Sequence, residues 1–493
     1  STEGRSSAES VLYKRQVYMK TADLELCYMS ATDVLKNFRT KKISPSELTK
    51  ALISRCKDVN PSLNAITENH FQEATEAAKK ADKKYFNLKS SRLRALEGVP
   101  IAVKDFHSIK GHRTTYGSKA FEHHKADNTA PTVDRLFKAG ANLLIRTTTP
   151  EFAYSGLTRS PLWGTTKNPW DLNCTPGGSS GGAAAAIAAG MTTLADGTDG
   201  GGSCRIPAAF SGCVGYKPPY GRNPSDREHP LETLLVYGPV TRTVNDAALM
   251  QNVTTGKHVA DQASLSENYQ LPSEHSSVKG MKIALSMNLG YYEIAPDVEK
   301  NTRDMATALR RLGATVDEVD VGWNWGVLDT WYTRWEAAFA GLVGDLLPRW
   351  KYEMTPYCAK ILEKGLEHSA VRLYKTNAGR AQQWDSLAPI LEKYDALICP
   401  TLAVSSLPNS HNEDGDDFTI NGKHVNNYLG WTLTYPFNNL NWCPVMSVPS
   451  GFGDTGMPTG LQICGRTYDD VTVFRIASAL EKARPWAGTR PPI

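Results

Sequence analysis

Two glycine-rich segments in the middle of the chain constrain its fold more than any other feature. The first is CTPGGSSGG, residues 174–182, which leads into the alanine run AAAAIAAG, and the second is GTDGGGSCRIPA, residues 197–208. Glycine weakens helices and strands, so it is expected where the backbone turns sharply or another segment approaches closely. The two segments are therefore candidates for functional turns beside a tightly packed helix.

Strand-like and helix-like segments alternate along the chain. Apolar runs that predict buried strands cover residues 99–106, 142–149, 191–197, 282–288, 315–321, 396–401, 445–452 and 460–465. Segments with the spacing of helices precede and separate these runs. They include one that begins with a capping box at 44–47 and a long helical region over about 328–395. This alternation is typical of an α/β protein with a largely parallel sheet. The polar, acidic segment 409–424 predicts a solvated surface loop.

Composition and charge exclude several classes of protein. Of the 493 residues, 55 are Lys or Arg and 51 are Asp or Glu, which gives a net charge of +4. Because the basic residues form no long stripe, nucleic acid and anionic membranes are not expected as main partners. No apolar run reaches the roughly 18 residues that a membrane span needs, and the N-terminal segment lacks the apolar core of a secretory signal.

Cysteine and histidine spacing argues against metal binding. The nine cysteines are irregularly spaced without a C-x-x-C motif, and the adjacent pair His123-His124 lacks the spacing of two ligands on one helix face. An odd number of scattered cysteines also disfavours a disulfide framework and favours a reducing compartment. We therefore expect a cytoplasmic protein without a metal site or cofactor.

Three kinds of chemistry compete for the glycine-rich turns. A phosphate site is disfavoured because neither segment contains a P-loop or a clean G-x-G-x-x-G. Residues 177–181 fit the nucleophile elbow G-x-S-x-G, but the preceding KNPWDLNCTP predicts a loop where that motif requires a strand. The third candidate is a serine nucleophile, Ser203, beside consecutive backbone N–H groups. Its base would be Lys104, because burial in the apolar strand 99–106 favours the neutral amine.

Three separated motifs in a fixed order resemble the amidase signature family. They are GVPIAVKD at 98–105, PGGSSGG at 176–182 and GTDGGGSCRIPA at 197–208, and the resemblance extends over roughly residues 27–487. It implies an α/β fold with a large twisted mixed β-sheet flanked by helices on both faces. It further implies an N-terminal extension at 1–26, a single domain at 27–487 with its signature core at about 95–250, and a C-terminal tail at 488–493.

The resemblance also assigns roles to individual residues. Ser203 is the implied nucleophile, Ser179 the proton relay and Lys104 the general base, with a cis peptide between Gly178 and Ser179. The N–H groups of Gly200, Gly201, Gly202 and Ser203 form the implied oxyanion hole. Gly178, Ser180, Asp199 and Arg205 are supporting residues: Asp199 orients the nucleophile turn, and Arg205 makes a structural ion pair.

Residues for the substrate pocket are less sharply defined by the sequence. Tyr154 matches the loop that tends to line the acyl pocket in this family. Trp331 and Trp335 lie at helical spacing in GWNWGVLDTWYTRW, where aromatic residues usually belong to the core. We name all three as pocket candidates, with core packing as the alternative for the two tryptophans.

The leading functional expectation is an amidase that acts on a small-molecule amide with water through an acyl-enzyme. Hydrolysis of a carbamate (urethane), an anilide or an aryl ester by the same residues is the first alternative. A glutaminase subunit of an amidotransferase and a binding protein with an inactive site are further alternatives. No feature of the sequence determines the oligomeric state, and a homodimer is the candidate assembly.

Overall fold

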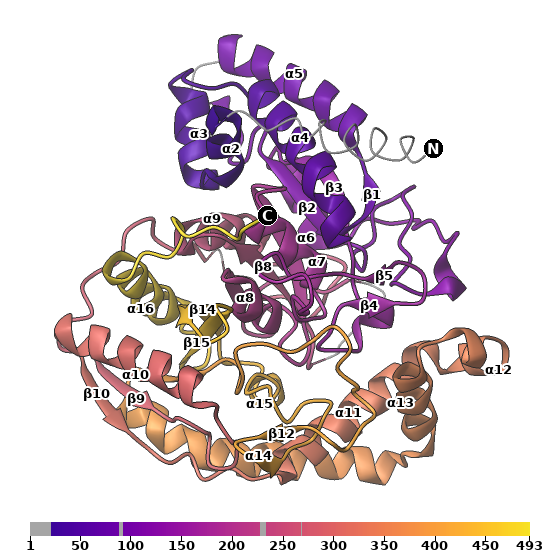
Figure 1. Cartoon of the computed structure of the whole chain (residues 1–493), viewed down its shortest axis with the longest axis vertical. Coiled ribbons are helices and arrows are strands. Elements are labelled where there is room, and N and C mark those ends of the chain that lie inside the picture. The colour runs from indigo at the N-terminus through magenta and orange to yellow at the C-terminus, as the bar shows by residue number, and fades with distance from the viewer. Residues whose placement is uncertain (1–20, 88–91, 227–232, 268) are drawn as a thin grey trace, which may run out of the picture.

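The computed structural model describes residues 21–87, 92–226, 233–267 and 269–493. Its centre is an 11-stranded sheet in the order β1-β3-β2-β6-β8-β7-β14-β15-β11-β9-β10 (Figure 1). The strands are β1 (Ile66–Asn69), β2 (Pro100–Lys104), β3 (Asn142–Thr147), β6 (Leu194–Asp199), β7 (Val214–Lys217), β8 (Val236–Thr241), β9 (Lys282–Leu285), β10 (Thr315–Glu318), β11 (Ala396–Pro400), β14 (Val445–Phe452) and β15 (Pro458–Gly465). Two small hairpins pair β4 (Arg159–Ser160) with β5 (Gly164–Thr165), and β12 (Thr419–Ile420) with β13 (Lys423–His424).

The sheet is mixed, as the family resemblance implies, and the prediction of a largely parallel sheet is wrong. Strands are parallel near the two ends, where β2 pairs with β3 and β6, and β9 pairs with β10 and β11. The edge strand β1 is antiparallel to β3. The middle is antiparallel from β6 through β8, β7, β14 and β15 to β11. The strands β14 and β15 are joined by a short turn, which leaves no room for the crossover that a parallel pair requires.

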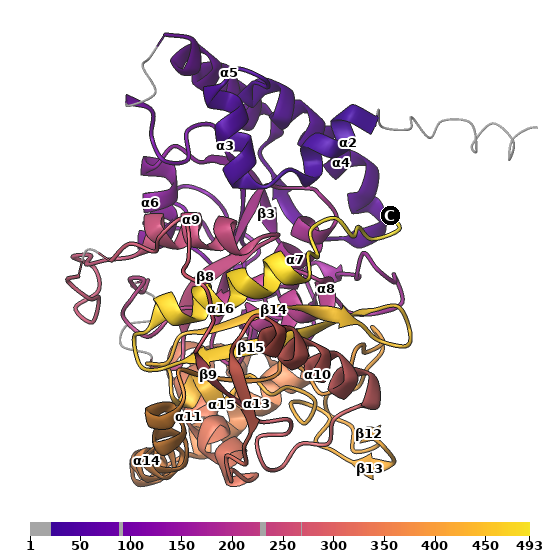
Figure 2. The ribbon, with the colours of Figure 1, turned by 90° about the vertical axis from the view of Figure 1, so that its left-hand side faces the viewer.

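Helices cover both faces of the sheet. Along β11, Ile398 belongs to one apolar core with α9 (Val244–Thr254), α10 (Pro296–Arg311) and α16 (Asp470–Ala483). Its neighbour Leu397 belongs to the opposite core, with α8 (Arg205–Ser211), α11 (Gly326–Val343), α13 (Pro356–Glu367) and α14 (Ala370–Lys393). Successive strand residues point to opposite faces, so the strand is buried on both sides. Figure 2 views the molecule from the side of α10 and α16.

The N-terminal helices gather beside the β1–β3 end of the sheet (Figure 1). They are α2 (Thr21–Tyr28), α3 (Ala31–Arg39), α4 (Pro45–Leu63) and α5 (Phe71–Asn87). The predicted capping box starts α4: the Ser44 side chain accepts from the Glu47 N–H, and the Glu47 carboxylate accepts from the Ser44 N–H. At the other end of the chain, the Ile493 carbonyl accepts a hydrogen bond from Arg55 of α4.

The predicted helical region 328–395 is divided into several helices. Between α11 and α13 lie α12 (Leu347–Trp350) and the short 3₁₀ turns at Gly344–Leu346 and Lys351–Glu353. Prolines stand in the first turns of α12 and α13, where a proline fits a helix start and disfavours continuation of the preceding turn, although α14 accommodates Pro389 in its interior.

The segment 409–424 is not simply a solvated loop, which corrects the prediction. Exposed and buried residues alternate along it, and both His411 and Glu413 are buried. The Glu413 carboxylate accepts from the Ser155 hydroxyl and lies 3.2 Å from the Arg159 guanidinium. An acidic residue in this segment is therefore buried because it has a charged partner on the neighbouring chain segment.

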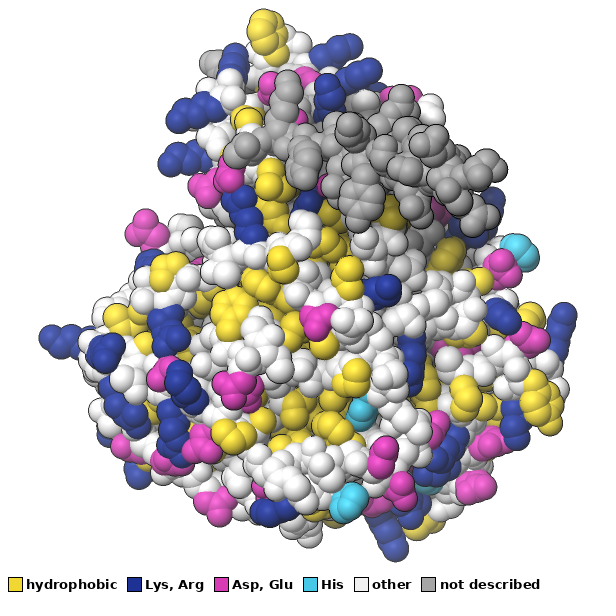
Figure 3. Space-filling view, in the orientation of Figure 1, with side chains coloured by type: hydrophobic (Ala, Val, Ile, Leu, Met, Phe, Trp, Pro, Cys, Tyr) yellow, Lys and Arg dark blue, Asp and Glu magenta, His cyan; other side chains and the backbone are white. Residues whose placement is uncertain are grey.

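Charged side chains of both signs are interspersed over the face shown in Figure 3. Among the described helices, none is both long enough and apolar enough to cross a membrane.

Candidate active site

Lys104 occupies the end of β2, between the parallel strands β3 and β6, and is fully buried. Its Nζ lies 2.7 Å from Ser179 Oγ, 2.7 Å from Thr198 Oγ1 and 3.1 Å from Ser180 Oγ. Three hydroxyl groups surround the amine, and burial lowers the pKa of Lys104 to about 7. Near neutral pH, the amine therefore exists to a large extent in the neutral form that can accept a proton.

The first glycine-rich segment brings Ser179 to this amine. The peptide between Gly178 and Ser179 is cis, which confirms the prediction, and Ser180 immediately precedes α7 (Gly181–Ala188) without capping it. The Gly178 backbone runs directly against a neighbouring segment, because a Cβ there would lie 2.7 Å from the Ser155 carbonyl oxygen. The close approach of a neighbouring backbone, rather than helix capping, therefore explains why this segment contains glycine at 178.

The second glycine-rich segment connects the end of β6 to the start of α8, and Ser203 lies in this connection. Ser203 and Ser179 line the same cavity, and Ser203 is 8% exposed whereas Lys104 and Ser179 are fully buried. Gly202 adopts a φ of +128°, which L side chains rarely adopt. Of the three predicted catalytic residues, Ser203 is thus the one accessible from outside.

A buried ion pair holds the second segment in place. The Asp199 carboxylate lies 2.8 Å from the Arg205 guanidinium and accepts from the Cys204 N–H at 3.2 Å. Burial alone would raise the pKa of Asp199, but the charge and hydrogen bonds of Arg205, the Asn438 hydrogen bond and the Lys217 charge together keep the pKa below its usual value. Arg205 also donates to the Gln462 side chain, which ties this turn to β15. The two supporting contacts expected from the sequence are therefore present.

The cavity at Ser203 is narrow and apolar. It encloses about 30 Å³, and the described residues that line it carry no charged side chain. Its apolar walls are Phe106, Phe152, Ala153, Leu235, Trp335, Ala338, Phe339 and Leu342. Leu342 is 43% exposed and marks the mouth of the cavity.

The three predicted pocket residues occupy different positions around this cavity. Trp335 forms part of its wall, and Trp331 stacks behind Trp335 with 5.0 Å between ring centroids. Tyr154 packs behind the wall against Trp335 and Phe339. The structure thus brings Trp335 to the cavity surface and places the other two in the layer that supports it.

Comparison with known proteins identifies the family. The sequence profile of the family described as Amidase matches residues 47–474. The chain belongs to the amidase signature family. A curated relative, an acylamidase of Rhodococcus erythropolis, is 36% identical over 94% of this chain and 98% of its own length. The crystal structure of a bacterial aryl acylamidase of this family superimposes with a TM-score of 0.86, at 30% identity, covering 93% of this chain and 97% of that chain.

Other relatives are amidotransferase subunits. A glutamyl-tRNA(Gln) amidotransferase subunit from Dehalococcoides mccartyi strain CBDB1 is 33% identical over 92% of this chain and 96% of its own length. Taken together, the family and the acylamidase relatives make this amidase a hydrolase of amide C–N bonds.

Several residues around Lys104 escape prediction from the sequence. Thr198 contributes one of the three hydroxyl partners, and Asp196 accepts a hydrogen bond from the Lys104 N–H at 2.7 Å. Asp196 also contacts the buried His107 ring at 2.5 Å. Their positions inside or beside the recognised motifs are the only signal in the sequence, because motif spacing does not show which side chains face the amine.

A group of potential metal ligands lies apart from this site. Among the described residues, Glu68, His70 and His112 place ligand atoms within 4.8 Å of one another, which the spacing of histidines did not indicate. The Arg113 guanidinium lies 3.5 Å from the Glu68 carboxylate and competes with a cation for it. We therefore assign no metal to this group.

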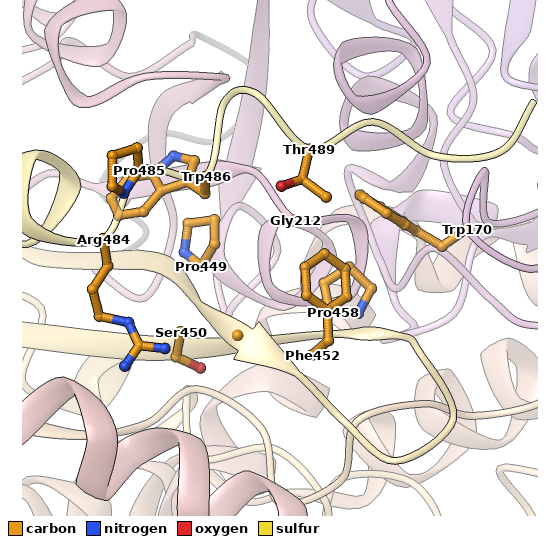
Figure 4. Close-up of a pocket in the computed structure, with 11 residues that line it drawn as sticks. Trp170, Gly212, Pro449, Ser450, Phe452, Pro458, Arg484, Pro485, Trp486 and Thr489 are labelled. Atoms are coloured by element: carbon orange, nitrogen blue, oxygen red, sulfur yellow. The ribbon is translucent and has the colours of Figure 1, made fainter.

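A second cavity, of about 330 Å³, lies between the C-terminal segment and the β14–β15 hairpin (Figure 4). Trp170, Phe452 and Trp486 contribute to its walls. Because none of the predicted catalytic residues reaches it, this cavity is not the candidate active site.

Proposed function

We propose that the amidase hydrolyses small carboxylic amides through an acyl-enzyme on Ser203, with Ser179 and Lys104 as proton carriers. The observation that carries the proposal is the fully buried Lys104 amine at 2.7 Å from Ser179 Oγ, with Ser179 and Ser203 on one cavity. Neutral Lys104 accepts the Ser179 proton while Ser179 accepts that of Ser203, and Ser203 Oγ attacks the substrate carbonyl.

The later steps return the proton. The N–H groups of Gly200, Gly201, Gly202 and Ser203 stabilise the tetrahedral oxyanion. The proton then passes from Lys104 through Ser179 to the leaving nitrogen as the C–N bond breaks. Water then attacks the acyl group as its proton passes through Ser179 to Lys104. That proton returns through Ser179 to Ser203 Oγ as the carboxylic acid leaves, which restores the Ser203 hydroxyl. These steps use side chains, backbone and water alone.

The lining and the small volume of the cavity favour a small apolar acyl group. Aromatic and aliphatic walls stabilise such a group by removing it from water. An anilide, a carbamate or an aryl ester presents a similar carbonyl to the same residues, so these remain the alternative substrates. Glutamine, the substrate of a glutaminase subunit, carries two charges that the described lining does not match, so this alternative is less well supported.

The remaining proposals concern the setting of the enzyme. The nine cysteines include no disulfide, which supports the proposed reducing, cytoplasmic compartment. We propose residues 27–487 as one catalytic domain between the extension 1–26, of which residues 1–20 lie outside the described part of the chain, and the tail 488–493. We retain a homodimer as the proposed assembly, which sedimentation would test.

Replacing the nucleophile tests the proposed chemistry. Ser203→Ala is expected to abolish hydrolysis of a chromogenic anilide and labelling by a fluorophosphonate, with unchanged thermal unfolding. Ser386→Ala, on α14 and outside the site, is the matched serine control and should retain both activities. Wild-type turnover by Ser203→Ala would refute the proposal.

A further inference from the structure

The oxyanion segment, residues 199–203, accepts hydrogen bonds through its carbonyl groups from distant parts of the chain. Asn438 Nδ2 donates to the Asp199 carbonyl at 3.0 Å, and Trp331 Nε1 donates to the Gly200 carbonyl at 3.0 Å. Thr434 Oγ1 donates to the Gly201 carbonyl at 2.6 Å. The donors come from α11 and from the segment before and within α15 (Pro436–Asn439), far along the chain from the segment that they hold.

Each of these bonds also fixes the direction of the next N–H group. A trans peptide unit is planar, so its C=O and N–H point in opposite directions. Holding the Gly200 carbonyl toward Trp331 therefore aims the Gly201 N–H the other way, and holding the Gly201 carbonyl toward Thr434 aims the Gly202 N–H. Glycine has the most freedom to rotate away from such an orientation, so three consecutive glycines need external restraint.

The missing side chains of these glycines are what allow the donors to approach. A Cβ on Gly201 would lie 2.7 Å from Trp331 Cζ2, and a Cβ on Gly202 would lie 2.1 Å from Thr434 Oγ1. Both donors thus lie directly on the backbone. Trp331 is 2% exposed and Thr434 is fully buried, so water does not compete for either bond.

We propose that Trp331 and Thr434 are positioning residues that set the oxyanion hole through the Gly200 and Gly201 carbonyls. The proposal rests on the proposed function, because it requires Ser203 to generate an oxyanion at this segment. Neither residue touches the reacting atoms. Each acts on the transition state by restricting the rotation of one peptide unit, which aligns its N–H before the reaction.

Variants that remove one donor while retaining its shape test this role. Trp331→Phe keeps an aromatic ring without the N–H, and Thr434→Val keeps the branched shape without the hydroxyl. We expect kcat for a chromogenic anilide to fall about tenfold or more with little change in KM, somewhat less than for direct loss of an oxyanion donor. Thr434→Ser, which retains the hydroxyl, should recover most of the rate.

Inhibitor binding separates positioning from general damage. The affinity for an aryl trifluoromethyl ketone, which becomes a tetrahedral oxyanion on Ser203, should fall by the same factor as kcat/KM. The affinity for the corresponding secondary alcohol, which fills the cavity without an oxyanion, should stay constant. Trp323→Phe, which removes an indole hydrogen bond to the Gln383 carbonyl outside the site, serves as the matched control and should retain kcat.

The outcomes distinguish this proposal from the proposed function. An active Ser203→Ala enzyme would refute the function itself. An inactive Ser203→Ala enzyme together with wild-type kcat and ketone affinity in Trp331→Phe and Thr434→Val would overturn the positioning role alone. Equal losses of ketone and alcohol affinity would also overturn it, because they would indicate a deformed cavity.

Discussion

The titration of Lys104 determines how activity should depend on pH. If the neutral amine is the base, kcat/KM rises with pH through the pKa of the free enzyme and reaches a plateau above it. With a pKa of about 7, the profile should have its inflection near neutrality and a slope of one proton. At about pH 5.5 only roughly 3% of the amine is neutral, so kcat/KM should lie about 30-fold below the plateau.

The same shift has a consequence for stability. A change from 10.5 to about 7 corresponds to about 5 kcal/mol in favour of the neutral amine. The folded pKa is the lower one, so the unfolded chain binds the extra proton between about pH 7 and 10.5, and this contribution makes the folded enzyme more stable as pH rises over that window. Lys104→Met should remove this contribution and should be inactive at every pH.

Three measurements in matched buffers check these expectations: anilide hydrolysis, the rate of fluorophosphonate labelling, and urea unfolding of wild type and Lys104→Met. The first two should share one inflection, because both report the activation of Ser203. An inflection near pH 10, a rate independent of pH, or a Lys104→Met enzyme that retains turnover would refute the reasoning.

Further predictions concern the packing around the site. Asp199→Asn leaves its guanidinium partner buried without a counter-charge and should cost about 3–5 kcal/mol in urea unfolding, whereas a loss under about 1 kcal/mol would contradict the structural role of the pair. Gly178→Ala places a Cβ against the Ser155 carbonyl and should abolish activity and lower the melting temperature. Gly341→Ala, in α11 with open space around it, should instead stabilise by about 1 kcal/mol, and the same calorimetry compares the two. Phe339→Ala widens the cavity and should raise kcat/KM for a bulky acyl anilide relative to an acetyl anilide; an unchanged ratio would place the acyl group elsewhere.

Local features of the fold could be predicted well from the sequence. The Ser44 capping box involves groups three residues apart, so its pattern is visible in the chain. The burial of Lys104 follows from the apolar strand around it, and the cis peptide before Ser179 follows from the family resemblance. In each case the information lies in one short segment or one recognised motif.

Features that depend on distant segments could not be predicted in this way. The hydrogen bonds from Trp331 and Thr434 reach the oxyanion segment from residues 131 and 233 positions away. The burial of Glu413 depends on Arg159, and the antiparallel middle of the sheet depends on which strands pair. Periodicity identifies the buried face of an element, but it does not identify the partner that covers it.

The helix α11 serves two parts of the enzyme at once. Trp335, Ala338, Phe339 and Leu342 recur at helical spacing and form one wall of the cavity. One turn earlier, Trp331 holds the Gly200 carbonyl. Substrate preference can therefore be redesigned at Ala338, Phe339 and Leu342 while the backbone geometry needed for bond cleavage stays intact. The indoles at 331 and 335 must be left in place, because Trp335 stacks on Trp331 and packs against Gly200.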